Sequence, residues 1–298
     1  MKHFLALFFL LCSYGLYAND STNFFLVAKS GKVSFHENQG KGWHTISEKD
    51  TIAPNSSIRI EKFSYLLIKS GKGYLEFNIA GTYNLSEYGE YLKPGVPIVQ
   101  QYEQIILDSL KIPAKTAKGQ YAKELLDAKT DGRDLLSVYP PPTIIYDREI
   151  TLRWRPMDNN IYIVRMYHSE LSQYFYREVK GDQVTVDMIG LNFPTDRCIY
   201  WSVGIKGSEY WSVPKCVYIL NIGESSNIIL PAYALEEDLN LERSAYHNLM
   251  MAFYYESEKV QHKAELYYEK AWSLSNNNPR YKQLYYDFLK RRNSVVID

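Results

Sequence analysis

Short runs of alternating apolar and polar residues fill the chain from about residue 23. The segments are NFFLVAK, KVSFHE, SIRIEK, SYLLIKS, GYLEFNI and TYNLSE, rich in β-branched and aromatic residues. Period-two alternation predicts half-buried strands, and the Gly residues between the runs mark turns. The pattern therefore predicts a small all-β module of hairpins over residues 23–86.

The pattern changes twice before it returns to strands. Ile98–Leu110 has apolar residues at helical spacing, and a polar stretch follows it. Pro140–Pro142 predicts a stiff, extended linker, so residues 87–142 are interpreted as a connector whose end is a domain boundary. Residues 143–222 then carry strand patterns that predict a β-sandwich: EITLRW, IYIVRMY, YFYREV, QVTVDM, CIYWSVGI and SVPKCVYIL.

From Leu230 onward the apolar period becomes helical. Three helical runs are expected, at Glu236–Glu256, Val260–Leu274 and Arg280–Arg292. Pro279 suits the first turn of the last helix, where a missing N–H costs little. The acidic run Glu236–Asp238 is expected in the first turn of a helix, where negative charge offsets the dipole. The fold class is therefore multidomain β plus α, with a helical region over residues 230–298.

The first twenty residues, MKHFLALFFLLCSYGLYAND, follow the order of a secretory signal. Lys2 precedes an apolar run from Phe4 to Leu11, and Ala18 stands at a small-residue cleavage point. Residues 1–18 are thus predicted to be a removed signal peptide, with a retained anchor as the alternative. No later segment is long and apolar enough to span a membrane. The sequence predicts an exported chain.

Composition and spacing exclude several kinds of site. Lys+Arg 34 balances Asp+Glu 34, so no global positive field favours nucleic acid. Three cysteines and six histidines show neither a Cys-x-x-Cys nor a His-x-x-x-His pair. No Gly-rich phosphate loop or Gly-x-Ser-x-Gly elbow occurs. We expect no metal, no cofactor and no enzymatic activity, although distant carboxylates could still be assembled into a hydrolase site.

Two cysteines, Cys198 and Cys216, lie in a predicted hairpin whose odd positions are apolar. Centring the turn on Gly207 pairs Trp201 with Val213 and places the two cysteines opposite each other on the outward face. This predicts a cross-strand disulfide. The alternative is two free thiols, with the register shifted by a bulge. The same parity places Trp154, Trp201 and Trp211 in the core rather than on a sugar-binding surface.

Three stretches resemble known domain families. AKSGKVSF, followed by GKGWHTISEKDTIAPNSSIRIEKFSYLLIKSGKGYLEF, resembles the FecR-type β domain of bacterial envelope proteins. ITLRWRP, YIVRMY and DRCIYWSVGIKGSEYWS together resemble a fibronectin type III-like domain. MAFYYESEKVQHKAELYYEKAWSLSNNNP resembles one tetratricopeptide repeat, with Ala252, Ala264 and Ala271 at the small-residue positions.

The resemblances imply both the domains of the chain and its function. They imply a FecR-like module, a fibronectin III-like sandwich, and a helical hairpin with a capping helix. By analogy, the chain is expected to be a non-catalytic scaffold or adaptor that binds another protein in the periplasm or at the outer membrane. The alternative is a protein that binds cell-wall or surface glycan, which needs outward aromatic rings. By the repeat pattern, the candidate partner groove consists of Tyr246, Leu249, Phe253, Glu256, Arg280, Gln283 and Asp287.

Overall fold

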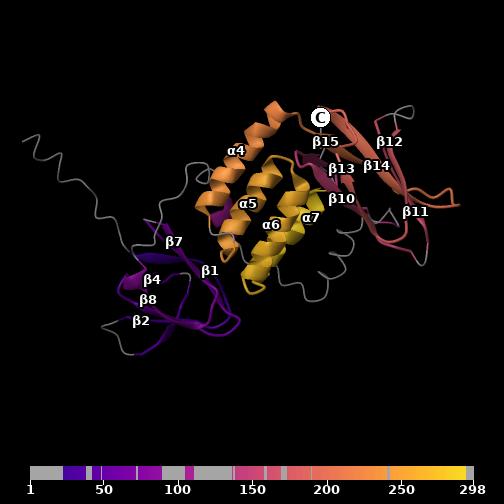
Figure 1. Ribbon diagram of the computed structural model, residues 1–298. Helices are drawn as coiled ribbons and strands as arrows, with labels where there is room; N and C mark the ends of the chain where they lie inside the picture. The colour runs from indigo at the N-terminus through magenta and orange to yellow at the C-terminus, as the bar shows by residue number, and fades with distance from the viewer. Residues whose placement is uncertain are drawn as a thin grey trace, which may run out of the picture. The chain divides into compact units, whose positions relative to one another are not determined.

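The computed structural model forms two compact units, Met1–Gly95 and Val96–Asp298, called here the N-terminal and C-terminal units (Figure 1). It describes residues 23–37, 42–47, 49–71, 73–88, 105–110, 136, 138–157, 160–168, 173–188, 190–239 and 242–292. The predicted signal peptide and most of the predicted connector lie outside these ranges. No helix within them is long and apolar enough to cross a membrane.

Two four-stranded sheets make up the N-terminal unit. One has the strand order β4-β1-β6-β7, the other β3-β2-β5-β8. Six of the strands lie in the segments that the alternation predicts, whereas the two-residue strands β3 and β4 lie outside them. Their bounds are β1 Phe24–Ser30, β2 Val33–His36, β3 His44–Thr45, β4 Thr51–Ile52, β5 Ser57–Ile60, β6 Tyr65–Ser70, β7 Gly73–Phe77 and β8 Gly81–Asn84, with a 3-10 turn at Leu85–Glu87.

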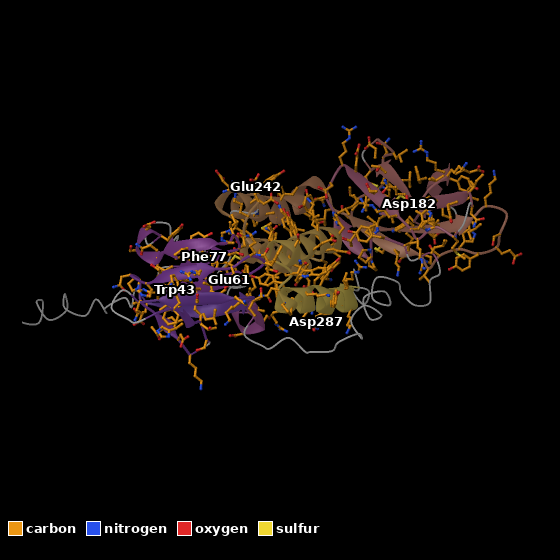
Figure 2. The ribbon with its side chains drawn as sticks, turned by 90° about the horizontal axis from the view of Figure 1, so that it is seen from below. Trp43, Glu61, Phe77, Asp182, Glu242 and Asp287 are labelled. Atoms are coloured by element: carbon orange, nitrogen blue, oxygen red, sulfur yellow. A yellow bond between two sulfur atoms is a disulfide. The ribbon has the colours of Figure 1, made fainter. Side chains whose placement is uncertain are left out.

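The core of this unit is formed by apolar side chains from both sheets, among them Phe35, Ile58, Ile68 and Phe77. Figure 2 labels Phe77 here, together with Trp43, whose ring is stacked by the Arg59 guanidinium at 4.0 Å. The turn after β1 depends on Gly31, which has φ +72°. A Cβ at this position would lie 2.9 Å from the Ser64 Cα, so any other residue would clash.

The described part of the C-terminal unit begins with helical residues 105–110, and a sandwich of two sheets follows. A two-stranded sheet, β10-β13, packs against a five-stranded sheet with the order β12-β11-β14-β15-β9. All neighbours are antiparallel except β15 and β9, which are parallel. The bounds are β9 Thr143–Ile145, β10 Glu149–Arg153, β11 Tyr162–Tyr167, β12 Gln173–Val179, β13 Gln183–Asp187, β14 Arg197–Ile205 and β15 Lys215–Ile219.

Residues before the three prolines already belong to the sandwich. Leu136 and Val138 are buried in its core, and Tyr139 forms a bridge with Arg153. Pro140 and Pro141 are buried as well, and the Tyr139–Pro140 bond is cis. The proline run therefore packs against the sandwich rather than separating it from what precedes, and the compact unit begins at Val96.

Four helices follow the sandwich: α4 Ile222–Asp238, α5 Ala245–Ser257, α6 Gln261–Leu274 and α7 Pro279–Arg292. Pro279 begins α7, as predicted. The expected single run Glu236–Glu256 is wrong. The run contains the end of α4 at Asp238 and the start of α5 at Ala245, so it is not one helix. α4 also begins earlier, where the Asn221 side chain accepts a hydrogen bond from the Glu224 N–H at 2.8 Å.

The α5–α6 hairpin is closely packed because its contact positions are small. Ala252, Ala264 and Ala271 are 0%, 0% and 1% exposed, and α7 adds a stacked Tyr268–Phe288 ring pair at 4.8 Å. This is the packing expected from the small-residue spacing. It makes the hairpin and α7 one helical layer.

The acidic run Glu236–Asp238 lies in the last turn of α4, not in a first turn, so the dipole explanation is wrong. Glu236 is instead held by tyrosines. Its carboxylate accepts hydrogen bonds from the hydroxyl groups of Tyr267 at 2.7 Å and Tyr255 at 3.5 Å. These bonds tie the end of α4 to α5 and α6.

Candidate functional site

The outward side of the five-stranded sheet carries a contiguous group of aromatic side chains around one arginine. Cross-strand pairing places Arg165 beside Tyr176 on one strand and Ser202 on the other, and Tyr167 beside Tyr200. Trp211 lies next to Gly204 in the following row. We call Arg165, Tyr167, Tyr176, Tyr200 and Trp211 the aromatic face.

Arg165 is held between two rings of this face. Its guanidinium carbon lies 3.9 Å from the Trp211 ring centroid and 5.1 Å from the Tyr167 centroid. Its Nε donates a hydrogen bond to Ser202 Oγ at 2.9 Å, and Ser202 is fully buried. Cation–π contact and this hydrogen bond hold the side chain in one orientation.

Trp211 reaches the outward face because the hairpin changes register near its turn. The backbone N–H of Ser212 donates to the Val203 carbonyl at 2.7 Å, and Ser212 Oγ accepts from the Val203 N–H at 3.0 Å. Val203 therefore opposes Ser212, and Gly204 opposes Trp211. A Cβ at Gly204 would lie 2.7 Å from the Trp211 ring, so only glycine lets the ring lie against β14.

Two predictions from the hairpin are corrected by this register. Trp211 is half-buried and Val213 is 46% exposed, so neither belongs to the core, whereas Trp154 and Trp201 do. The predicted pairing 198–216 is also displaced by two residues, since Cys198 opposes Tyr218 and Tyr200 opposes Cys216. Pro214, which has no N–H for a ladder bond, lies where the register changes.

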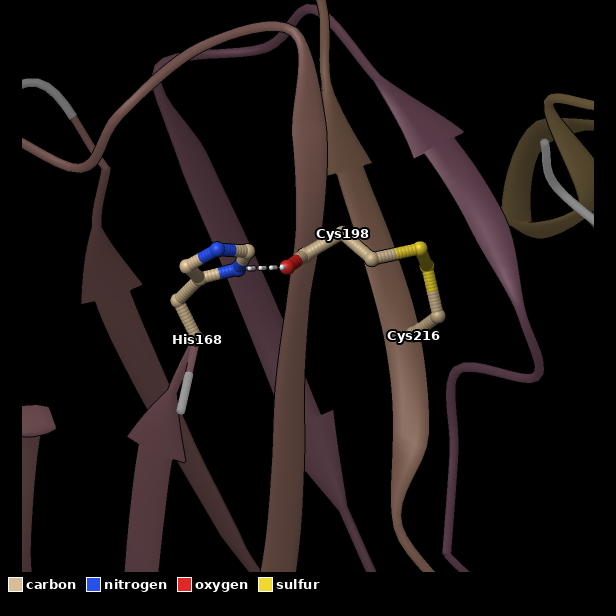
Figure 3. Close-up of a disulfide and its surroundings, with 3 residues drawn as sticks. All are labelled: His168, Cys198 and Cys216. Carbon is tan, nitrogen blue, oxygen red and sulfur yellow. Dashed lines mark hydrogen bonds between the residues drawn. A yellow bond between two sulfur atoms is a disulfide. The ribbon is translucent and has the colours of Figure 1, made fainter. Parts of the chain in front are cut away.

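The Cys198–Cys216 disulfide is nevertheless formed in the structure, diagonally across β14 and β15 (Figure 3). The two Cα atoms are 5.3 Å apart. His168 Nδ1 lies 3.2 Å from the Cys198 carbonyl oxygen. The disulfide is next to Tyr200 and borders the aromatic face.

The predicted groove residues of the helical region do not line an open surface. Tyr246, Leu249 and Gln283 are 1%, 0% and 8% exposed, so they present almost no surface to a partner. This corrects the prediction for these three. The repeat pattern placed them on an inner face, but the packed helices of this unit cover that face.

The other four groove residues are half-buried and engaged within the chain. Glu256 forms a bidentate ion pair with Arg291, at 2.8 and 3.1 Å, and accepts the Tyr268 hydroxyl at 2.6 Å. Asp287, labelled in Figure 2, accepts from Gln283 at 2.8 Å. Phe253 lies 5.8 Å from the Tyr268 ring, and Arg280 Nε donates to the Ser109 carbonyl. These contacts give the residues structural roles.

A polar network joins the sandwich to the helical layer. The Ile144 N–H of β9 donates to the Lys259 carbonyl at 3.0 Å. The chain at Lys259 therefore occupies a hydrogen-bonding group of this edge strand. His262 lies with Nδ1 3.1 Å from Thr143 Oγ1 and with Nε2 3.3 Å from Asp147 Oδ2. The two layers are thus connected by both backbone and side chains.

Lys263 completes this network. Its Nζ lies 3.0 Å from Asp147 Oδ1 and donates to the Tyr146 hydroxyl at 2.9 Å. Burial alone would raise the pKa of Asp147, but the His262 hydrogen bond and the Lys263 charge outweigh it and lower that pKa. The pKa of Tyr255, which accepts from Tyr146, is raised by burial and by this hydrogen bond. These charged side chains connect the sandwich to the helical layer. Among the described residues no group of His, Cys, Asp and Glu could hold a metal ion.

Sequence reasoning missed the aromatic face because it assigned Trp211 to the core. Tyr167, Tyr200 and Arg165 do alternate with buried residues along their strands, and that alternation was the available signal. It shows which residues point outward, but not which of them meet across the sheet.

No family model and no curated protein matches this chain. Two of the solved structures that resemble it are fibronectin III arrays. The crystal structure of chicken CNTN1 FN1–FN3 domains has 10% identity and a TM-score of 0.18, covering 64% of this chain and 57% of that one. The central fibronectin-III array of RIM-binding protein has 13% identity and a TM-score of 0.18, with 67% and 55% covered. Because both TM-scores are this low, the two structures support no conclusion about this chain.

Proposed function

We propose that the protein is a non-catalytic, exported scaffold or adaptor that binds another protein of the bacterial cell envelope. The aromatic face of the sandwich is the contact surface in this proposal. The single observation behind it is the cluster of one Trp, three Tyr and one Arg on one side of one sheet. Location in the periplasm or at the outer membrane follows from the predicted signal and stays part of the proposal.

The residue types support a protein partner. Trp, Tyr and Arg are enriched where binding energy concentrates in protein interfaces. Tyr176 and Tyr200 are 52% and 39% exposed, which leaves ring area to bury. Arg165 is already ordered by Trp211, Tyr167 and Ser202, so little side-chain entropy is lost on binding.

The construction of the C-terminal unit supports a scaffold. The Asp147–Lys263 ion pair and the Ile144–Lys259 backbone bond connect the sandwich to the helices. A partner on the aromatic face would therefore be held in a defined position relative to the helical layer.

Affinity capture from envelope extract tests this function. The full mature chain is immobilised beside Tyr200→Ala/Trp211→Ala, with Tyr233→Ala as the matched control because Tyr233 is a 65% exposed ring on α4. We expect one protein to be retained by the wild type and the control and lost from the double variant. Equal retention by all three would reject the aromatic face as the contact surface.

A glycan-binding function is the second candidate, and the outward position of Trp211 favours it. Flat exposed rings are what a sugar surface requires, and the predicted core position of Trp211 had argued against this. Sedimentation of the same three proteins with purified cell wall separates the two functions. Trp211-dependent sedimentation without a captured protein would support glycan binding.

A further inference from the structure

Among the described residues no ion pair joins Arg165 to a carboxylate, whereas three other arginines of the C-terminal unit are paired in this way. Arg291 pairs with Glu256, Arg292 with Glu265, and Arg148 with Asp187. Arg165 uses Nε for Ser202, and neither of its terminal nitrogens has a partner among the described residues. Within the part of the chain that the structure describes, the two terminal nitrogens of this half-buried guanidinium therefore have no acceptor.

The surrounding charges do not supply one. Glu178 is the carboxylate on the same side of β12, one row from Arg165, and it pairs with Lys206 at 2.8 Å. That pair is neutral in sum, so among the described residues of the aromatic face the positive charge of Arg165 is not compensated. A guanidinium stacked on aromatic rings keeps its N–H edge free, and this edge matches a carboxylate in a planar, bidentate geometry.

We propose that the partner of the aromatic face contributes an acidic side chain, an Asp or Glu carboxylate, that binds the terminal nitrogens of Arg165. This rests on the proposed protein-binding function and adds the chemistry of the partner. Trp211 and Tyr167 cover the guanidinium, while Tyr176 and Tyr200 contact the residues flanking the acid. A peptide is favoured over a saccharide because the guanidinium already stacks on the Trp211 ring, where a sugar would stack.

Binding of a random Glu–Tyr copolymer to the immobilised full chain tests the proposal, with a Lys–Tyr copolymer as the opposite-charge control. Arg165→Gln is expected to weaken binding of the Glu–Tyr copolymer about tenfold, the size of a lost charged hydrogen bond. Arg165→Lys keeps the positive charge but loses the two-pronged guanidinium donor, so its affinity for the copolymer should lie between those of the wild type and Arg165→Gln. Arg177→Gln is the matched control, because Arg177 is an exposed arginine of β12 on the opposite parity, across from Val164. Thermal unfolding of each variant shows whether the sheet remains intact.

Each result of these binding measurements either supports or overturns the carboxylate site. Loss confined to the Arg165 variants supports the carboxylate site, whereas equal loss with Arg177→Gln overturns it as unspecific charge attraction. Arg165-dependent binding of polygalacturonate, with none of the Glu–Tyr copolymer, overturns the peptide in favour of an acidic saccharide. Capture of an envelope protein that depends on Trp211 but is unchanged in Arg165→Gln would leave the adaptor function standing and reject this inference alone.

Discussion

The aromatic face and the helical layer use the same residue types, tyrosine and arginine, in opposite ways. On the sandwich, Arg165 is stacked between rings, and its terminal nitrogens have no partner in the described ranges. On the helices, Arg291 and Arg292 meet glutamates, and Tyr268 and Tyr285 donate to the same carboxylates. Residue type alone therefore does not make a surface available for binding. An arginine is available to a partner when no acidic side chain of its own chain already binds it.

Breaking the buried pair of the helical layer should have the largest effect. Arg292 and Glu265 side chains are 5% and 13% exposed, so Glu265→Ala leaves a buried charge without its partner. We expect a loss of about 3–5 kcal/mol in unfolding free energy, measured by urea denaturation. The double variant Glu265→Leu/Arg292→Met should recover most of it. No recovery would show that packing, not charge, explains the loss.

Removing the disulfide beside the aromatic face should have the next largest effect. The bridge spans a sequence separation of 18 residues, and loss of such a loop constraint costs about 3 kcal/mol. Cys198→Ser/Cys216→Ser should therefore unfold at lower urea concentration, measured by circular dichroism. Thiol titration of the unfolded wild type must find no free thiol at these positions. Two free thiols would contradict the bridge itself.

Gly204→Ala tests whether the position of Trp211 depends on glycine. The added Cβ meets the ring at 2.7 Å, so the ring must move off β14 and the Arg165 stack must open. We expect a loss of about 1–2 kcal/mol in stability and a weaker capture of the partner. Gly204 does not have a left-handed φ, so the expected loss comes from the clash with the ring and not from backbone strain. Unchanged capture by Gly204→Ala would separate Trp211 from binding.

Acid should weaken the junction between the two regions slightly. The pKa of Asp147 is lowered in the folded protein, so its stabilisation is present above the ordinary carboxyl range near about pH 4 and is lost as pH falls through the lowered value. Because Asp147 is about one-third exposed, the effect should stay below about 1 kcal/mol. Urea titrations of wild type and Asp147→Asn between pH 5 and pH 2.5 measure it. An equal acid dependence in both proteins would assign the effect elsewhere.

Much of the local structure was predictable. Apart from the short strands β3, β4 and β9, the strand segments of both units and the α6 and α7 segments follow the apolar periods. The close α5–α6 contact follows from Ala252, Ala264 and Ala271. The start of α4 was missed because Asn221, a good N-cap, directly follows a strand pattern. The FecR-like and tetratricopeptide-like resemblances stay predictions, as does the signal peptide.

The sequence by itself determined which residues alternate, which helical positions are small, and that Cys198 and Cys216 fall in adjacent strands. These are properties of neighbours along the chain. Only the tertiary structure decided that Trp211 points outward. The pairing of the two strands shifts by one residue near Pro214, and a one-residue shift exchanges the inward and outward side chains of that segment. The tertiary structure also decided that Arg291 and Arg292 have acidic partners while Arg165 has none among the residues that the structure describes. Pairing across strands and helices depends on distances between residues far apart in sequence, and a single chain's pattern does not contain those distances.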